Sequence, residues 1–271
     1  MEKNNRDDQK IAQNLSRIKH KIIVLSGKGG VGKSTVSVNL AFALSEKKYM
    51  VGLMDCDMHG PSIPKILGVE KKKPTASPMG FNPIMITPHL KVMSIGFLLS
   101  DTDSPVIWRG PMKMGAIKQF IGDVDWGDLD YLIVDLPPGT GDEPLSIAQL
   151  IPKSDGAVIV TTPQDLALVS VRKSINFVKK MNMPIIGIIE NMSGFTCPHC
   201  HKDIDIFKTG GGLKASIDFQ VPFLGKIPLD PDIVTTGDSG EPFLTKHSQA
   251  HATKSFKQIV EKIEEIVNQR R

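Results

Sequence analysis

Residues 27–34 hold the combination of side chains best suited to chemistry in this chain. They read Gly-Lys-Gly-Gly-Val-Gly-Lys-Ser and satisfy the phosphate-loop pattern G-x-x-x-x-G-K-[ST]. Glycines let successive backbone N–H groups turn toward phosphate oxygens, because no Cβ atom crowds the turn. In this pattern Lys33 reaches the β- and γ-phosphates of ATP, and the Ser34 hydroxyl coordinates Mg²⁺. The expected ATP contacts in this loop are Gly27, Lys28, Gly29, Gly30, Val31, Gly32, Lys33, Ser34 and Thr35.

The same glycines also imitate a dinucleotide-binding fingerprint. Gly27, Gly29 and Gly32 spell G-x-G-x-x-G, and Asp55 follows Gly32 by 23 residues, near the place of the ribose-binding acid. Nothing in that fingerprint calls for a lysine and a serine directly after the last glycine. A phosphate loop accounts for every residue of the segment, so we favour it.

Three aspartates could complete a nucleotide site. Asp135 ends the apolar run 131–135, and the carboxyl end of a central strand is where open α/β sheets bind ligands. It fits a Walker B role, in which the carboxylate holds Mg²⁺ through water. Asp55 and Asp57 follow a second short strand. Phosphoryl transfer to water needs a group that orients the nucleophile, and a carboxylate on a mobile loop can do so. These residue types together predict ATP hydrolysis.

Cys197-Pro-His-Cys200 lies among Gly, Lys and Asp residues typical of an exposed loop. One possibility is intrachain zinc with nitrogen ligands from His199 and His201, since a zinc ribbon would need a second cysteine pair and the chain has only Cys56 besides. Another is a thiol–disulfide exchanger. The third is half of a shared site, in which two thiolates from each of two subunits form the Cys₄ shell of a [4Fe–4S] cluster.

The surrounding pattern alternates strands with helices. The β-branched run 21–25 precedes the glycine loop, and 34–46 follows it as an expected helix. Such alternation predicts an α/β fold with a doubly wound, mostly parallel sheet and helices on both faces. Residues 58–90, rich in Pro, Gly and Lys, are expected to be loops around a short helix. Further strands are expected at 51–54, 92–95, 131–134, 157–161, 185–189 and 223–227, and further helices at 8–19, 112–121, 143–150, 166–181 and 251–268.

We expect an N-terminal helix or extension over 1–20 and a single P-loop ATPase domain over 21–271, with the C-x-x-C loop near 194–203. The 271 residues are 40% hydrophobic and 23% charged, which suits one domain of this size. A net charge of +4 is too small to indicate nucleic acid, and no apolar run is long enough for a membrane span. Three cysteines without a secretory signal favour a reducing, cytoplasmic location.

The second lysine of the loop, Lys28, carries a resemblance. Lys-Gly-Gly-Val-Gly-Lys-Ser resembles the deviant Walker A loop of the class containing nitrogenase iron protein, the MinD and ParA ATPases and the arsenite-pump ATPase. The resemblance implies a homodimer that sandwiches two ATP molecules, with Lys28 acting on the partner's nucleotide. It also implies that Asp57 positions the attacking water and that Asp55 supports the magnesium shell.

A longer series of motifs is similar to the Mrp/ApbC-type iron–sulfur cluster carrier ATPases. It comprises the phosphate loop, Asp-Cys-Asp-Met-His-Gly-Pro-Ser at 55–62, Trp-Arg-Gly-Pro-Met at 108–112, Asp-Leu-Pro-Pro-Gly-Thr-Gly-Asp at 135–142, Glu-Asn-Met-Ser at 190–193, Cys-Pro-His-Cys at 197–200 and Ile-Pro-Leu-Asp-Pro at 227–231. The match runs from about residue 20 to 245. It implies that Cys197 and Cys200 hold a labile cluster bridging two subunits, received from an assembly scaffold and delivered to apo-proteins. It also implies that Asn191, Pro228 and Asp230 bind the adenine side of ATP.

A MinD/ParA-like positioning ATPase, with structural zinc on the cysteine pair, is the alternative. A MinD-like protein would be expected to end in a basic amphipathic helix. Here the face of 251–268 opposite its apolar residues mixes acids with lysines, so we expect this helix to pack against the sheet rather than a membrane.

Overall fold

The computed structural model describes residues 2–98, 110–151, 153–197, 199–200 and 202–270. Trp108 and Arg109 of the motif at 108–112, and the possible ligand His201, lie outside these residues. Within the described residues, no helix is both long and apolar enough to cross a membrane.

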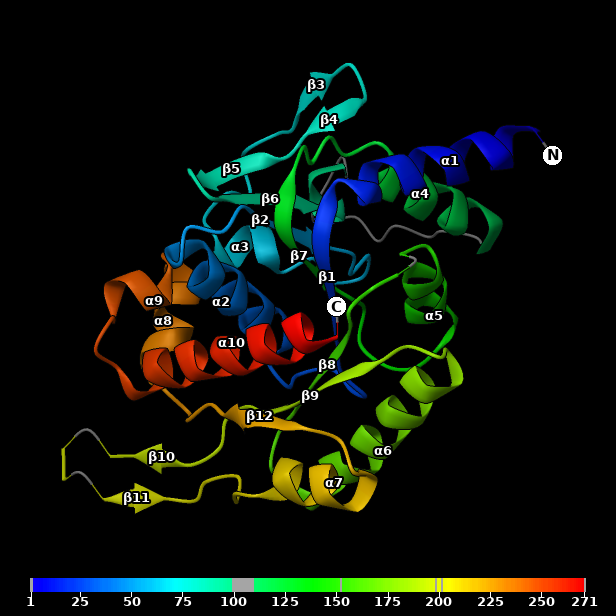
Figure 1. The fold of residues 1–271 in the computed structure, drawn as a ribbon. Helices are drawn as coiled ribbons and strands as arrows, with labels where there is room; N and C mark the ends of the chain where they lie inside the picture. The colour runs from blue at the N-terminus through cyan, green and yellow to red at the C-terminus, as the bar shows by residue number, and fades with distance from the viewer. Residues whose placement is uncertain (1, 99–109, 152, 198, 201, 271) are drawn as a thin grey trace.

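An eight-stranded sheet forms the centre of the molecule (Figure 1). Its strands are β1 (Ile18–Leu25), β2 (Val51–Asp55), β5 (Ile84–Thr87), β6 (Leu90–Ser94), β7 (Leu129–Asp135), β8 (Gly156–Thr161), β9 (Ile185–Glu190) and β12 (Phe223–Lys226). They lie in the order β12-β9-β8-β1-β7-β2-β6-β5. Neighbouring strands run parallel except β5 and β6, which are antiparallel because a short turn joins them. The expectation of a mostly parallel sheet is confirmed.

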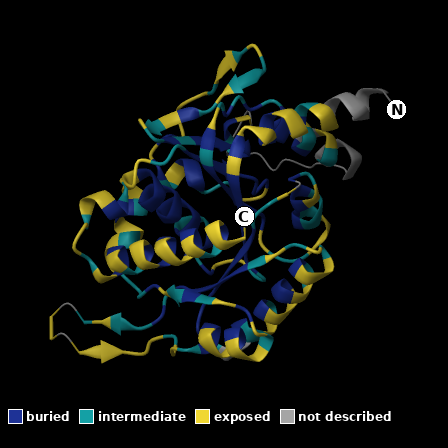
Figure 2. Ribbon diagram, viewed as in Figure 1, coloured by how far each residue is buried: buried dark blue, intermediate teal, exposed yellow. Residues whose placement is uncertain are grey.

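Helices cover both faces of the sheet, as expected. They are α1 (Glu2–Ser16), α2 (Lys33–Glu46), α3 (Ile63–Ile66), α4 (Gly110–Gly122), α5 (Asp142–Gln149), α6 (Asp165–Lys180), α7 (Gly211–Phe219), α8 (Pro231–Ser239), α9 (Phe243–Lys246) and α10 (His251–Gln269), with a 3₁₀ turn at Ile95–Leu98. Helices α2 and α10 pack together on one face, and α6 and α7 pack together on the other (Figure 1). Figure 2 shows the result, with buried strands between helices whose outer surfaces are exposed.

The central strands are buried on both faces, which explains their continuous apolar sequence. Ile22, Ile23 and Val24 of β1 are fully buried, and so are Leu132 and Val134 of β7. A ligand can therefore reach these central strands only at their ends, where β1, β2 and β7 give way to loops.

Segment 58–90 contains more regular structure than expected. The short helix is present as α3, but β5 extends the sheet beside β6, and β3 (Thr75–Ser77) pairs with β4 (Gly80–Asn82) in a separate hairpin. The prediction of loops was wrong for β3, β4 and β5, because these strands are short and lie between the turn residues on which the prediction rested. Strand β6 was expected at 92–95 and begins two residues earlier.

Both terminal helices pack against the body. Ile11 and Leu15 of α1 are buried, and the Asn14 amide donates to the Gly122 carbonyl at the end of α4. Phe256, Ile259, Val260, Ile263 and Val267 of α10 are buried where this helix meets β9, β12 and α2. The apolar face of α10 is thus covered by the sheet side of its own chain, as the sequence predicted.

Candidate nucleotide site and cysteine hairpin

The phosphate loop joins the buried end of β1 to the first turn of α2. Gly30 and Gly32 have φ angles of 76° and 77°, a left-handed conformation that glycine adopts without a Cβ penalty. A Cβ atom on Gly32 would also lie 2.3 Å from the Asn191 amide nitrogen, and one on Gly27 would lie 2.3 Å from the Ser170 carbonyl oxygen. The glycines therefore serve both the turn and the close packing around it.

A buried cluster connects this loop to the end of β7. The Lys33 ammonium lies 2.6 Å from Oδ2 of Asp135, and the Ser34 hydroxyl donates to the same oxygen at 2.7 Å. The Ser37 hydroxyl donates to the other oxygen, Oδ1, at 2.6 Å. Asp135 thus meets both phosphate-loop side chains that the sequence assigned to phosphate and Mg²⁺.

Asp55 stands beside Asp135, because the two residues are paired in the register of β2 and β7. Burial, followed by the negative charge of Asp135, raises the pKa of Asp55 to about 7. The Ser94 hydroxyl and the Asp57 N–H donate to its two oxygens at 2.8 and 3.1 Å. Carboxylate oxygens and a serine hydroxyl are ligands that Mg²⁺ prefers, and a cation here would offset the paired charges. The donor set therefore fits magnesium.

Asp57 lies in the loop that follows β2 and is almost fully buried. Its Oδ1 accepts the backbone N–H groups of His59 and Gly60, each at 3.1 Å. This turn fixes the carboxylate at the edge of the phosphate cavity. Cys56, between the two aspartates, is buried, and burial raises the pKa of its thiol. It is a packed residue of the core.

Two adjoining cavities lie over these groups. The first, of about 300 Å³, is lined by residues 29–35 together with Asp57 and Pro138. The second, of about 290 Å³, brings together Thr35, Asn191, Pro228 and Asp230. Both linings include Gly32, Thr35, Ser62 and Ile66, so the cavities adjoin along these residues. This shape suits a nucleotide whose phosphates and base occupy different chambers.

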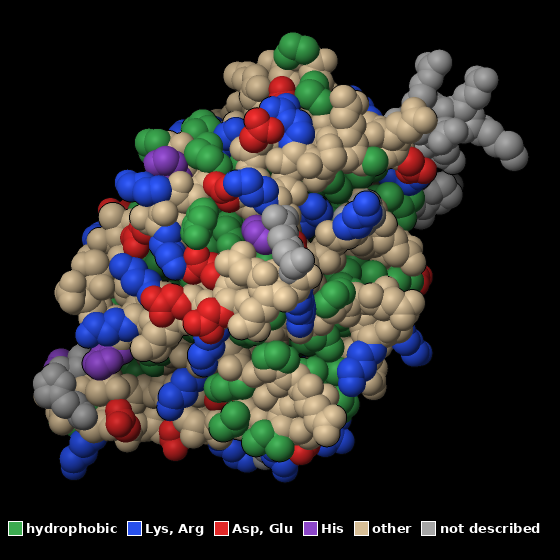
Figure 3. Space-filling model, in the orientation of Figure 1, with side chains coloured by type: hydrophobic (Ala, Val, Ile, Leu, Met, Phe, Trp, Pro, Cys, Tyr) green, Lys and Arg blue, Asp and Glu red, His purple; other side chains and the backbone are tan. Residues whose placement is uncertain are grey.

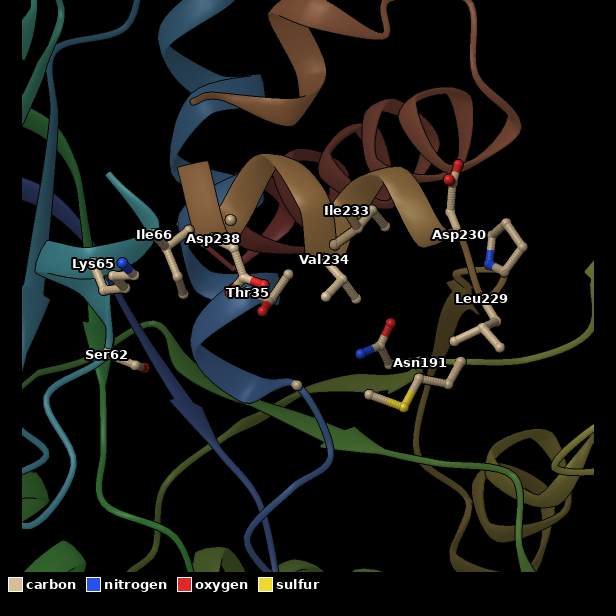
Figure 4. A pocket seen from close by; sticks show the side chains of 14 residues that line it. Thr35, Ser62, Lys65, Ile66, Asn191, Leu229, Asp230, Ile233, Val234 and Asp238 are labelled. Carbon is tan, nitrogen blue, oxygen red and sulfur yellow. The ribbon is translucent and has the colours of Figure 1, made fainter. Parts of the chain in front are cut away.

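The second cavity contains every residue expected on the adenine side. In Figure 4 the Asn191 amide points into the space opposite Ile233 and Val234 of α8. Asp230 caps α8 by accepting the Asp232 N–H at 3.0 Å, so its carboxylate has a structural role as well.

Lys28 stands apart from the other loop residues. It is half-buried and lies outside the linings of both cavities, while its carbonyl accepts the Ser26 hydroxyl at 2.9 Å.

The cysteine pair lies at the tip of a hairpin formed by β10 (Phe195–Thr196) and β11 (Asp203–Ile204). This hairpin projects from the body at the lower left of Figure 1 and forms the margin of the surface in Figure 3. Cys197 is half-buried and Cys200 is exposed. Backbone N–H groups of Cys200 and His199 donate to the Cys197 sulfur and lower its pKa, which favours the thiolate that a metal or cluster requires. Among the described residues, which exclude His201, no three His, Cys, Asp or Glu side chains are grouped to hold a metal.

Several residues of the candidate site were not predicted from the sequence. Lys65 and Ile66 of α3, and Ile233 and Val234 of α8, line the adenine-side cavity. Only the adjacent motifs at 55–62 and 227–231 could have pointed to these helices. Ser37 was also missed, although its place one helical turn after Lys33 is a usable signal.

Comparison with known proteins agrees with this geometry. Residues 17–264 match the ParA family description "NUBPL iron-transfer P-loop NTPase". The chain belongs to this NUBPL iron-transfer family of P-loop NTPases. Membership agrees with the phosphate loop at 27–34, and it makes the protein a nucleotide-binding P-loop NTPase.

Relatives in this family carry a consistent description. A protein of Methanocaldococcus jannaschii named iron–sulfur cluster carrier protein is 56% identical over 96% of this chain and 89% of its own length. One of the same name from Saccharolobus solfataricus is 51% identical over 96% of this chain and 88% of its own.

Solved structures place the fold. A nucleotide-binding protein of Archaeoglobus fulgidus, in complex with ADP, matches with a TM-score of 0.77 at 40% identity, covering 87% of this chain and 92% of its own. The septum site-determining protein MinD of Pyrococcus horikoshii, complexed with Mg-ADP, matches with a TM-score of 0.65 at 23% identity, covering 93% of this chain and 99% of its own. The likeness to MinD concerns the fold alone.

Proposed function

We propose that this protein is an ATPase that carries a [4Fe–4S] cluster between two subunits and transfers it to apo-proteins. The observation that carries the proposal is the cysteine hairpin, which presents two thiols at the margin of a P-loop fold whose relatives are named as cluster carriers. The cluster is cargo in this scheme. The partners of the protein are a second copy of the chain, an assembly scaffold that supplies the cluster and apo iron–sulfur proteins that receive the cluster. All of them are in the reducing environment of the cytoplasm.

In the ATPase part, Lys33 leaves Asp135 for the β- and γ-phosphates, and the loop N–H groups bind the remaining phosphate oxygens. Ser34, Asp55 and Asp135 hold Mg²⁺, which supplies neutralisation of the charge that develops on the phosphates. Asp57 orients the attacking water from the edge of the cavity. Asn191, Pro228 and Asp230 bind the adenine side. Lys28, which lines neither cavity of its own chain, contacts the nucleotide of the partner subunit.

In the carrier part, each chain supplies Cys197 and Cys200, and a cubane cluster takes four thiolates. A two-fold axis that brings two hairpins together completes the set. A cluster held at a subunit junction is released when the subunits change their geometry, which makes delivery to an apo-protein compatible with nucleotide control.

The structure offers less to the alternative of a MinD/ParA-like positioning ATPase with structural zinc. The helix that would reach a membrane, α10, has its apolar face packed against β9, β12 and α2.

The test is anaerobic reconstitution of the full-length protein with iron and sulfide, followed by iron, sulfide and protein determination. We expect about four irons and four sulfides per dimer, and transfer of the cluster to an apo-ferredoxin. A protein that binds no iron and sulfide would contradict the carrier proposal. Phosphate release from ATP with Mg²⁺, measured on the same sample, tests the ATPase part separately.

A further inference from the structure

Glu190 connects the nucleotide side of the sheet to the segment that carries the cysteine pair. It is the last residue of β9 and is 1% exposed, which is rare for a carboxylate. Its Oε1 accepts the Ser193 hydroxyl at 2.5 Å and the Gly210 N–H at 2.9 Å, and its Oε2 accepts the Gly212 N–H. One side chain therefore ties together both ends of the segment that contains the hairpin.

The far end of that segment is shaped to meet this carboxylate. Gly210 is the N-cap of α7 with a φ of 84°, and a Cβ atom on Gly212 would lie 3.0 Å from the Glu190 Cβ. A Cβ atom on Gly211 would lie 2.4 Å from the Pro163 carbonyl oxygen. Gly212 lets the start of α7 approach the carboxylate, Gly211 lets it approach Pro163, and Gly210 supplies the left-handed cap. The carboxylate accepts the free N–H groups of this helix end and faces the positive end of its dipole.

The near end of the segment is joined to the nucleotide cavity. The Asn191 amide, which points into that cavity, donates to the Val31 carbonyl of the phosphate loop at 2.9 Å. The Ile227 N–H donates to the Glu190 carbonyl at 2.8 Å, and the Leu229 N–H donates to the Gly194 carbonyl at 2.8 Å. The cavity wall at 228–230 and the base of the hairpin are thus one hydrogen-bonded unit.

We propose that Glu190 is a positioning residue that transmits occupancy of the nucleotide cavity to the geometry of Cys197 and Cys200. The inference rests on the proposed function, since it gives the nucleotide a way to act on the cysteines. Nucleotide contacts move Asn191 and the wall at 228–230. Because Glu190 clamps the adjoining residues to the start of α7, the movement passes into the hairpin instead of being absorbed by a loose segment.

The experiment uses full-length, metal-free protein and measures alkylation of Cys197 and Cys200 by iodoacetamide, with mass spectrometry as the readout. Rates are compared with and without a non-hydrolysable ATP analogue and Mg²⁺. In the wild-type protein we expect the analogue to change the rate by about fivefold or more. In Glu190→Gln one carboxylate oxygen becomes an NH₂ group, which cannot accept a hydrogen bond. Either the Gly212 N–H or the Ser193 and Gly210 donors then lose their acceptor, so one end of the segment is no longer held. We expect this variant to bind the analogue with wild-type affinity and to lose the rate change.

Two further variants make the test specific. Asp203→Asn alters the hairpin itself, where the Thr196 hydroxyl donates to Asp203 at 2.7 Å, and leaves the clamp intact. This variant should keep the nucleotide-dependent change in alkylation rate. If Asp203→Asn loses that change, the dependence arises from the hairpin itself and the role of Glu190 is overturned. Ser193→Ala removes one donor to Glu190 and keeps the charge, so it should reduce the rate change even if Glu190→Gln does not fold.

Each result has one consequence. The inference is overturned if the alkylation rates of the wild-type protein do not depend on the nucleotide. It is also overturned if folded Glu190→Gln shows the same nucleotide-dependent rate change as the wild-type protein. If Glu190→Gln does not fold, a wild-type rate change in Ser193→Ala overturns it instead. These outcomes leave cluster binding untouched. Failure of the wild-type protein to take up iron and sulfide would instead remove the proposed function.

Discussion

Asp55 and Asp135 are fully buried and stand opposite each other at the ends of β2 and β7. Two neighbouring carboxylates away from water resist joint ionisation. Burial, followed by the negative charge of Asp135, raises the pKa of Asp55 to about 7, so the Asp55 carboxyl keeps its proton until the pH approaches neutrality.

This relationship predicts a pH-dependent stability. The pKa of Asp55 in the folded protein lies above its ordinary value of 3.8, so between these two pH values the folded state binds more protons than the unfolded state. The free energy of unfolding should therefore fall as the pH rises from about 4 to about 7, and the Asp55 contribution should level off above that. Urea denaturation with EDTA and no nucleotide measures it. Asp55→Asn should flatten this dependence, and an unchanged slope in that variant would locate the titration elsewhere.

Lys33→Ala should abolish tight ATP binding. Charge-assisted hydrogen bonds contribute about 1.5–3 kcal/mol each, so losing contacts to two phosphates should weaken affinity by at least about a hundredfold. Calorimetric titration with ATP and Mg²⁺ measures the loss, with Lys72→Ala on the exposed loop as the matched control. Unchanged affinity in Lys33→Ala would remove the phosphate-loop assignment.

Asp57→Asn should preserve ATP binding and slow hydrolysis by about a hundredfold or more, because water is no longer oriented by a carboxylate. The amide oxygen can still accept the His59 and Gly60 N–H groups, so the turn should persist. Steady-state phosphate release gives kcat and KM separately, and only kcat should fall substantially. Hydrolysis at the wild-type rate would transfer the role to Asp55 or Asp142.

If Lys28 acts on the nucleotide of the partner subunit, two variants that are inactive alone should restore ATP hydrolysis when they are mixed. In a mixed dimer of Lys28→Ala and Asp57→Asn chains, one site has both substitutions and the other has neither. Mixing equal amounts should restore about a quarter of wild-type hydrolysis, since half of the dimers are mixed and each has one intact site. Phosphate release after subunit exchange checks this. No recovery despite exchange would place Lys28 on its own chain's nucleotide.

Replacing either cysteine of the hairpin should leave the cluster unbound. Cys197→Ser or Cys200→Ser removes two of four thiolates from a symmetric dimer, while the phosphate loop keeps its ATP affinity. Iron and sulfide per dimer after anaerobic reconstitution provide the measurement. Cys56→Ser is the control, because that thiol is buried beside the aspartates and should leave occupancy intact.

The same samples separate a bridging cluster from intrachain zinc. Full cluster occupancy in either hairpin variant would rule out the shared site. One zinc per chain that survives reconstitution would favour ligands from cysteine and histidine within a single subunit.

The sequence located the phosphate loop, the strand ends and the central sheet because these depend on local pattern. Glycine spacing and continuous apolar runs report directly on the turn between β1 and α2 and on burial of both sheet faces. Strands β3, β4 and β5 were missed because they contain three or four residues each, too few to show a period.

Contacts distant in sequence could not be predicted in the same way. The residues around Gly32 do not predict that a Cβ atom there would contact Asn191. The residues around Glu190 likewise do not predict its hydrogen bonds with Gly210 and Gly212. These contacts arise only when the sheet order brings β9 and β1 to either side of β8. The role of Lys65 and Val234 in the adenine-side cavity depends likewise on how α3 and α8 meet.

The hydrogen bond from Ser37 to Asp135 bears on the speed of the nucleotide cycle. Ser37 lies in the body of α2, and it holds Oδ1 while Lys33 and Ser34 share Oδ2. In the proposed cycle, Lys33 and Ser34 would leave Oδ2 for the nucleotide and Mg²⁺, while Ser37 would keep Oδ1 and hold the plane of the carboxylate. Asp135 would then need little reorganisation during either loading or release of the nucleotide.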